Sequence, residues 1–134
     1  MRIIDQDLIN NLYIQANISE RKRSHYQLHR SHQEKVQRLL IALVKGSYVD
    51  PHFHELSNQW EMFSVLEGCI KVCIYDTQGV IINTFFAGPE EYSALVEFNS
   101  GEIHSVECIS SQALMLEIKE GPFDPNYAKA FPRW

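Results

Sequence analysis

The chain has 134 residues, of which 45% are hydrophobic and 22% charged, and its formal net charge is −5. This composition is that of one globular domain, and it excludes collagen-like and intrinsically disordered chains. No apolar run reaches the roughly 20 residues of a membrane-spanning helix, and the first residues carry acids and amides where a signal peptide is continuously apolar. We therefore expect a cytoplasmic protein with no membrane partner.

The charge is distributed unevenly along the chain. Six basic residues fall between positions 21 and 38: Arg21, Lys22, Arg23, Arg30, Lys35 and Arg38. An acidic chain with one basic patch does not resemble a general nucleic-acid binder, and the patch fits a small anion such as a phosphate. Because guanidinium groups match phosphate geometry, we expect Arg21, Arg23 and Arg30 to bind that anion. A solvated helical face and turn is the alternative interpretation of the same charges.

The first 38 residues are expected to form a helical, basic N-terminal arm. Asp5 is placed to cap a helix whose apolar residues recur at helical spacing, namely Leu8, Ile9, Leu12, Tyr13 and Ala16. The polar, basic residues 19–28 indicate a connector. Ser31 followed by Glu34 has capping-box spacing, which predicts a short helical turn there.

Residues 39–120 have the pattern of a β-rich body. Short apolar or alternating segments (LLIALV, YVDPHFH, EMFSVLE, CIKVCIY, VIINTFF, ALVEF, IHSVECI and ALMLEIK) are separated by turn residues. Many short strands at near-regular spacing favour a β-sandwich or barrel, and Gly68 predicts a bend or tight turn. The tail, residues 121–134, contains three prolines and is expected to extend and pack against the barrel or a partner subunit.

Three histidines and one glutamate form a candidate metal site. His52 and His54 are two apart in a predicted strand, so both imidazoles point to the same face. Glu61 begins the next strand, and His104 lies in a later one. Three imidazoles and a carboxylate suit one divalent metal ion, and these ligands do not separate Zn, Fe, Mn and Ni.

The spacing of these residues resembles that of the cupin motifs. Gly46, the His52-x-His54 pair, Glu61 and Gly68 resemble the first motif. Asn99, Gly101 and His104 resemble the second motif, which usually has proline where Asn99 stands. The resemblance implies a double-stranded β-helix barrel in which His52, His54, Glu61 and His104 are the metal ligands.

Two features depart from the cupin pattern. Six residues separate His54 from Glu61, where three or four are common, and Cys108 stands where the second motif often ends in asparagine. A longer loop could deliver Glu55 as the ligand in place of Glu61. Glu55, however, follows His54 directly and would face outward if the strand continued.

A second resemblance covers nearly the whole chain. The arm SERKRSHYQLH, the segment VQRLLIALVKGSYVDPHFH and the tail LEIKEGPFDPNYAKAF are similar to the WbuC family of cupin-fold metalloproteins. Members of that family are associated with bacterial O-antigen, that is lipopolysaccharide, biosynthesis clusters. The resemblance implies a role in that process but no defined reaction.

These expectations allow three functions. The first is a metal-dependent isomerase or epimerase acting on an anionic sugar or sugar-nucleotide intermediate, which requires a positioned base. The candidates for that base are Glu55, Tyr48, Tyr75 and His29. An Fe(II)-dependent cupin dioxygenase and a non-catalytic carbohydrate-binding or regulatory cupin are the alternatives.

The remaining apolar residues are expected to be structural. We expect the core, or the contact of a homodimer, to include Trp60, Phe63, Val65, Phe85 and Phe86. We expect each of the three cysteines, Cys69, Cys73 and Cys108, to be a buried small hydrophobe.

Overall fold

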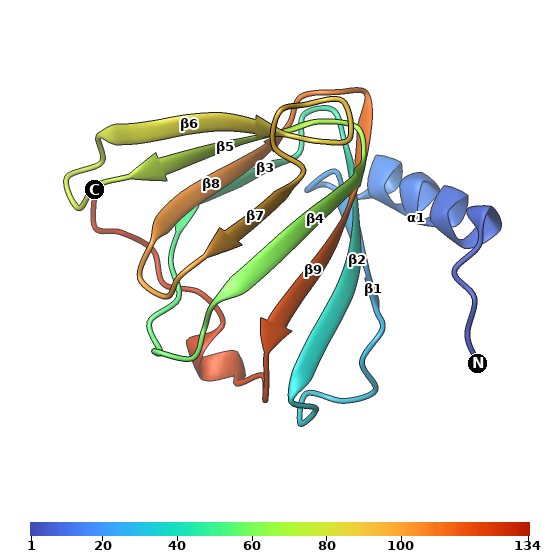
Figure 1. The fold of residues 1–134 in the computed structure, drawn as a ribbon, viewed down its shortest axis with the longest axis horizontal. Helices are drawn as coiled ribbons and strands as arrows, with labels where there is room; N and C mark the ends of the chain where they lie inside the picture. Colours follow the sequence, from blue (N-terminus) through green and yellow to red (C-terminus); the bar gives the residue numbers. More distant parts are fainter.

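Two antiparallel β-sheets face each other, and one helix packs outside them (Figure 1). The computed structural model describes all 134 residues. The elements are α1 (Gln6–Ile18), β1 (Arg23–Gln27), β2 (Val36–Val44), β3 (Tyr48–His52), β4 (Glu61–Glu67), β5 (Ile70–Tyr75), β6 (Ile81–Ala87), β7 (Leu95–Phe98), β8 (Ile103–Cys108), β9 (Gln112–Glu120) and a 3-10 helix (Pro125–Tyr127). The strand order is β1-β2-β9-β4-β7 in one sheet and β3-β8-β5-β6 in the other. The predicted all-β body with a short N-terminal helix is confirmed.

The sequence of β2 is a continuous apolar run because both faces of this strand are buried. Leu39, Ile41 and Leu43 face the second sheet and belong to the core between the sheets. Leu40 and Ala42 face outward and belong to a second cluster beneath α1. A strand covered on both sides needs apolar side chains at every position, whereas a half-exposed strand alternates.

The helix α1 forms as its apolar spacing predicts. The Asp5 side chain accepts a hydrogen bond from the backbone N–H of Leu8 at 3.0 Å, which caps the first turn. Leu12 and Tyr13 are buried against the sheet, and the Tyr13 hydroxyl lies 2.9 Å from Glu67 Oε2. Burial of each such side chain contributes about 1.5–3 kcal/mol. With 13 residues, α1 is too short to cross a lipid bilayer.

The expectation of a connector over residues 19–28 is wrong, because Arg23–Gln27 form strand β1. β1 pairs with β2, and its polar residues Arg23 and His25 lie opposite Leu43 and Ile41 on the inner face. Inward-facing strand residues are usually apolar, but these two are polar because this part of the inner face lines a cavity rather than the core. The boundary expected at residue 38 consequently falls inside β2.

Two smaller expectations also differ from the structure. Residues 31–34 form a turn, closed by the Glu34 N–H donating to the Ser31 carbonyl at 3.3 Å, and no helix begins there. Cys69 is half-buried because it lies at the turn between β4 and β5, whereas Cys73 and Cys108 are buried as expected.

The aromatic and aliphatic residues named from the sequence divide between core and surface. Phe63 and Val65 are buried in the core, Phe85 packs against it, and Trp60 is half-buried. Phe86 is 42% exposed on the edge strand β6.

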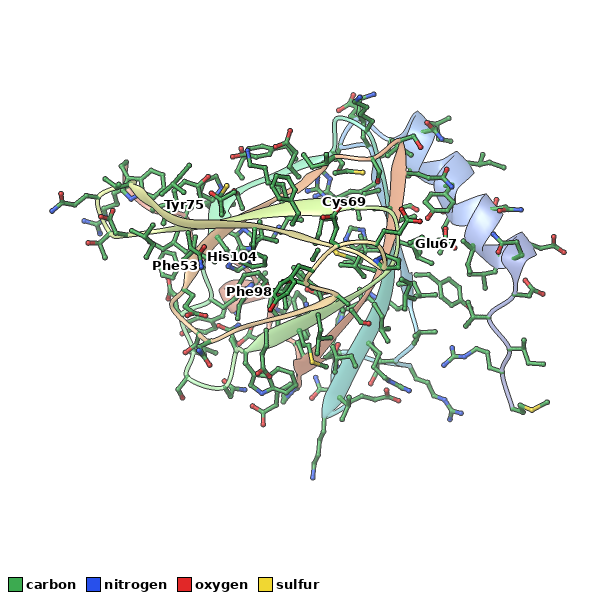
Figure 2. The ribbon with its side chains drawn as sticks, turned by 45° about the horizontal axis from the view of Figure 1, so that its top comes forward. Phe53, Glu67, Cys69, Tyr75, Phe98 and His104 are labelled. Atoms are coloured by element: carbon green, nitrogen blue, oxygen red, sulfur yellow. The ribbon has the colours of Figure 1, made fainter.

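The helix α1 and the histidines lie at opposite ends of the barrel. Glu67 lies at the end beside α1, whereas Phe53, Tyr75 and His104 lie at the opposite end (Figure 2). Residues 121–134 run past that opposite end, and the C-terminus lies near β5 and β6 (Figure 1). The tail and the histidines therefore share one end of the molecule.

Candidate metal centre

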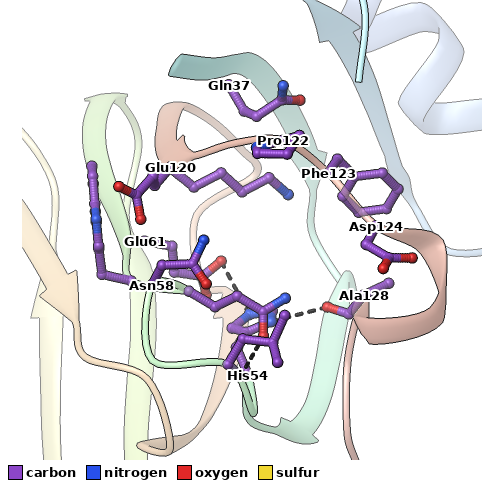
Figure 3. A pocket seen from close by; sticks show the side chains of 13 residues that line it. Gln37, His54, Asn58, Glu61, Glu120, Pro122, Phe123, Asp124 and Ala128 are labelled. Atoms are coloured by element: carbon purple, nitrogen blue, oxygen red, sulfur yellow. Dashed lines mark hydrogen bonds and ion pairs between the residues drawn. The ribbon is translucent and has the colours of Figure 1, made fainter. Parts of the chain in front are cut away.

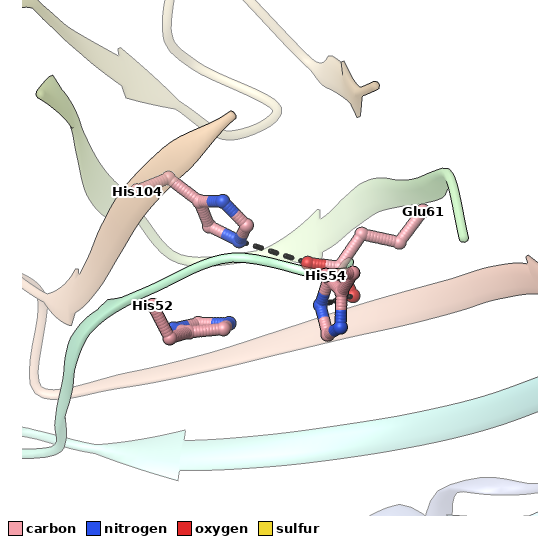
Figure 4. Close-up of side chains that lie close together, drawn as sticks. All are labelled: His52, His54, Glu61 and His104. Atoms are coloured by element: carbon pink, nitrogen blue, oxygen red, sulfur yellow. Dashed lines mark hydrogen bonds and ion pairs between the residues drawn. The ribbon is translucent and has the colours of Figure 1, made fainter. Parts of the chain in front are cut away.

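Four buried side chains meet between the two sheets: His52, His54, Glu61 and His104 (Figure 4). One possible ligand atom from each residue lies within 4.8 Å of the others. His52 ends β3 and lies opposite His104 of β8, and Glu61 is the first residue of β4. The structure thus brings together all four residues that the cupin spacing implied as ligands.

The backbone fixes the orientation of all three imidazoles. Each Nδ1 atom lies 2.8–2.9 Å from a main-chain carbonyl oxygen: His52 from that of Asp50, His104 from that of Glu102 and His54 from that of Ala128. A carbonyl accepts a hydrogen bond, so each Nδ1 carries the proton, and each Nε2 has its lone pair free for a metal ion. Such outer contacts are typical of metal-binding histidines.

The Glu61 carboxylate faces the Nε2 atoms of two of the histidines, and this arrangement requires a cation between them. Its Oε1 atom is 2.8 Å from Nε2 of His104, and its Oε2 atom is 3.3 Å from Nε2 of His54. Nε2 of His54 is buried and has no hydrogen-bond partner. Because a neutral imidazole has one N–H, already used at Nδ1, lone pairs would face the carboxylate unless a proton or metal ion lies between them. The residues present therefore fit a divalent metal.

The course of the loop between β3 and β4 places Glu61, and not Glu55, next to the histidines. Glu61 is 4% exposed and contacts two of them. Glu55 is exposed and lines a separate, open depression beside Phe53 and Trp134. The six-residue gap lengthens the loop without replacing Glu61 at the centre.

Burial and neighbouring charge tune the protonation of the centre. Burial raises the pKa of Glu61, but contacts with His104 and His54 outweigh it and hold that pKa well below its ordinary value. Burial, together with the nearby His104, lowers the pKa of His52 to about 4. Both groups are thus in their metal-binding forms at neutral pH.

A cavity of about 480 Å³ opens onto the centre from the barrel interior. Its walls are largely apolar, from strand residues such as Leu39, Ile41 and Met115. Its basic lining residues come from three separate parts of the chain: Arg21, Arg23, His25, Lys119 and Lys129. Desolvation, together with Arg23, lowers the pKa of His25 to about 4, so four of these side chains are cationic at neutral pH. Four cations in an acidic protein make this cavity suited to an anion.

The anion-binding residues named from the sequence divide between the cavity and the surface. Arg21 and Arg23 line the cavity, as the anion hypothesis requires. Arg30 is exposed in the turn after β1 and does not line it. Lys119 of β9 and Lys129 of the tail were missed, because nothing local in the sequence places them beside Arg23.

None of the four residues considered for the base lines this cavity. Glu55 lines the open depression, and Tyr48 is 45% exposed on β3. The Tyr75 hydroxyl lies 3.0 Å from Ser105 Oγ. His29 is buried in a small cavity of about 130 Å³, where its Nδ1 accepts a hydrogen bond from the Arg38 N–H at 3.0 Å.

Sequence reasoning missed Glu117, a buried carboxyl group of β9 that lines the cavity. Burial, together with the negative charge of Glu61, raises its pKa to about 8. Glu117 follows Met115 by two residues and so shares its inward face. A charged residue at an inward position of an apolar strand was the available signal.

Comparisons with known proteins identify the fold and the family. A family model described as a domain of unknown function (DUF6016) matches residues 4–86. No curated protein matches the chain.

Three solved structures of known proteins are similar to this chain. The capsular polysaccharide assembling protein CapF of Staphylococcus aureus is 18% identical with a TM-score of 0.70, over 86% of this chain and 33% of that one. The Mn(II)-containing oxalate decarboxylase of Bacillus subtilis is 23% identical with a TM-score of 0.57, over 73% and 24%. A cupin superfamily protein of Desulfitobacterium hafniense DCB-2 is 17% identical with a TM-score of 0.56, over 73% and 76%.

At these identities the likeness extends to the fold alone. The chain spans 33% of the CapF chain and 24% of the oxalate decarboxylase chain. It spans 76% of the Desulfitobacterium protein, so the shared unit is one barrel. The chain therefore has a cupin fold and belongs to the family described as a domain of unknown function, DUF6016.

Proposed function

We propose that the protein is a metal-dependent enzyme that isomerises or epimerises an anionic sugar derivative. The observation that carries this proposal is that three of the four converging candidate ligands, His52, His54 and Glu61, line a cavity with basic residues in its walls. A ligand that enters this cavity meets both the candidate metal and the cations. A sugar bearing a phosphate or carboxylate has groups for both.

A bound divalent metal would act as a Lewis acid toward neighbouring sugar oxygens and so acidify an adjacent hydroxyl or C–H group. The chain itself supplies the other functions. Arg21 and Arg23 bind the anionic end of the substrate. Glu117 is a carboxyl group of this cavity that is not among the four ligands, and we assign it the proton transfer.

The sugar in this proposal has two sources of support. The chain resembles the WbuC family through its arm and tail, and that family is associated with O-antigen biosynthesis. CapF, which has a similar fold, is described as a capsular polysaccharide assembling protein. Both relationships favour a substrate from bacterial surface-polysaccharide synthesis.

Deuterium exchange tests the proposal. The metal-loaded protein is incubated in D₂O with individual sugar phosphates and sugar nucleotides, and each is examined by mass spectrometry. We expect one of them to gain a single deuterium at carbon or to yield an isomer, and we expect Glu117→Gln to abolish this. A sugar that binds with neither exchange nor conversion would overturn the enzymatic proposal and support a binding protein. A reaction that depends strictly on O₂ would support the dioxygenase instead.

A further inference from the structure

The three candidate ligand histidines are not oriented in the same way. His52 and His104 each contact the carbonyl oxygen two residues earlier in the chain: that of Asp50 within β3, and that of Glu102 directly before β8. Those contacts form wherever the strands form. His54 contacts the carbonyl oxygen of Ala128, which is 74 residues away in the C-terminal tail. Of the main-chain contacts to the three imidazoles, therefore, only that of His54 comes from the tail.

The tail is held against this end of the barrel at several points. The backbone N–H of Ala130 donates to the Phe53 carbonyl at 2.9 Å, and the Phe53 N–H donates to the Ala130 carbonyl at 3.0 Å. Further back, the Phe123 N–H donates to the His32 carbonyl at 2.6 Å. The Trp134 ring packs over Tyr75, with centroids 5.5 Å apart. The position of the Ala128 carbonyl is thus determined from both sides.

The loop that departs from the cupin spacing supplies another of these anchors. Gln59 lies in that loop, and its Oε1 atom accepts a hydrogen bond from the Leu56 N–H at 2.8 Å. Its Nε2 atom donates to the Tyr127 carbonyl at 2.6 Å, next to Ala128. Loop and tail together enclose a small cavity against His54 and Glu61 (Figure 3). The extra loop residues therefore serve to fasten the tail.

The tail also contributes to the wall of the main cavity. Phe123, Ala128, Lys129 and Phe131 all line it. Lys129 directly follows the residue that orients His54, and it lines the same cavity as Arg21 and Arg23. One short segment thus contacts a candidate metal ligand and also adds a cation to the basic wall.

We propose that residues 122–131 form a strap that completes the site: the Ala128 carbonyl positions His54 for the metal, and Lys129 binds the anionic group of the ligand. This inference rests on the metal centre of the proposed function. Ala128 acts through His54 and is a positioning residue, whereas Lys129 would touch the ligand. The shared chemistry of that ligand is a phosphate or carboxylate group.

The strap is tested by loosening it without changing a ligand. The double variant Gln59→Ala/Ala130→Pro lacks two groups that hold the tail, the Gln59 side-chain amide and the backbone N–H of residue 130. We expect its Co²⁺ affinity, measured by titration of the visible spectrum, to fall about 10–100-fold, as is usual when an outer contact to a ligating histidine is lost. Arg133→Ala is the matched control, since this exposed side chain lies in the tail beyond residue 131, and we expect its Co²⁺ affinity to equal that of the wild type.

Nitrogen-15 NMR of the imidazoles separates positioning from general instability. In the metal-free wild type we expect His54 to be a single Nδ1–H tautomer, and in the double variant a mixture of tautomers, while His52 and His104 are unchanged. Should the double variant unfold, the single variant Gln59→Ala is measured in the same way. Wild-type Co²⁺ affinity in a folded, loosened variant would overturn the strap. Failure of the wild type itself to bind Co²⁺ would instead overturn the metal centre.

Lys129→Met tests the second half of the proposal with inorganic phosphate as the probe. The substitution leaves the backbone at position 128 intact, so we expect Co²⁺ affinity to stay within twofold of the wild type. Phosphate binding to the metal-free protein, measured by calorimetry, should weaken about tenfold, in line with the loss of one charged hydrogen bond. Unchanged phosphate affinity would remove Lys129 from the site. Comparison with acetate distinguishes a phosphate subsite from a general carboxylate one.

Discussion

The imidazole of His104 lies flat on the ring of Phe98, with centroids 3.8 Å apart and planes 9° from parallel. Phe98 is 2% exposed and belongs to the core between the sheets. The core therefore sets the plane of the His104 ring, while the Glu102 carbonyl sets its rotation. The candidate metal centre is thus continuous with the hydrophobic core.

Phe98→Leu should accordingly weaken metal binding as well as stability. We expect the free energy of unfolding to fall by about 1–2 kcal/mol and metal affinity to fall about tenfold because His104 loses its support. Phe63→Leu is the matched control, since Phe63 is also buried and packs on Phe98 at 5.4 Å. Equal losses of metal affinity in the two variants would show that the stacking has no specific role.

The stability of the metal-free protein should fall in acid partly through His52. Its pKa is about 4 in the folded state, below the ordinary value of 6.5, so the folded state binds fewer protons than the unfolded state. The corresponding stability is fully present above pH about 6.5 and is lost as pH falls toward 4, by at most about 3 kcal/mol. Urea unfolding between pH 7.5 and 4.5 measures this loss, and we expect His52→Gln to show a shallower decline. An equally steep decline in that variant would contradict the assignment.

Glu117 should have the opposite pH dependence. Its pKa is raised from 4.5 to about 8 in the folded state, so its contribution is fully present below pH about 4.5 and is lost as pH rises through 8. At high pH the folded protein bears the cost of ionising this buried carboxyl group. Glu117→Gln removes that cost, and we expect it to stabilise the metal-free protein at pH 8 by on the order of 2 kcal/mol. Thermal unfolding at pH 8 and pH 4.5 checks this, with exposed Glu97→Gln as the control. A gain of the same size at both pH values would refute it.

The basic wall predicts which arginine binds the anion. Arg23 lines the cavity and Arg30 does not. We expect Arg23→Gln to lower the affinity for inorganic phosphate about tenfold, whereas Arg30→Gln leaves it unchanged. Calorimetry at low salt is the measurement, since screening weakens such contacts as salt rises. A loss of affinity on substitution of Arg30 alone would favour a phosphate site on the arm surface.

The parts of the molecule that depend on local periodicity could be predicted from the sequence. The helix followed from the spacing of Leu12, Tyr13 and Ala16 and the Asp5 cap. The grouping of His52, His54, Glu61 and His104 followed from the cupin spacing, because strand alternation fixes which face each side chain occupies.

The parts that depend on tertiary position could not be predicted in the same way. β1 was missed because its inner residues Arg23 and His25 face a cavity and are polar. The contact between His54 and Ala128 joins two segments 74 residues apart, and no local pattern specifies it. Glu117 and Lys129 reach the cavity through sheet pairing and the course of the tail.

Metal content is the most direct test of the central claim, that His52, His54, Glu61 and His104 bind one metal ion. Protein purified without added metal is analysed by inductively coupled plasma mass spectrometry beside His52→Ala, Glu61→Gln and the control Glu55→Gln. We predict about one equivalent of a divalent transition metal in the wild type and in Glu55→Gln, and at least about a tenfold lower content in the other two. Equal metal content in all four proteins, or none in the wild type even after incubation with Zn²⁺, Mn²⁺, Fe²⁺ or Ni²⁺, would contradict the account.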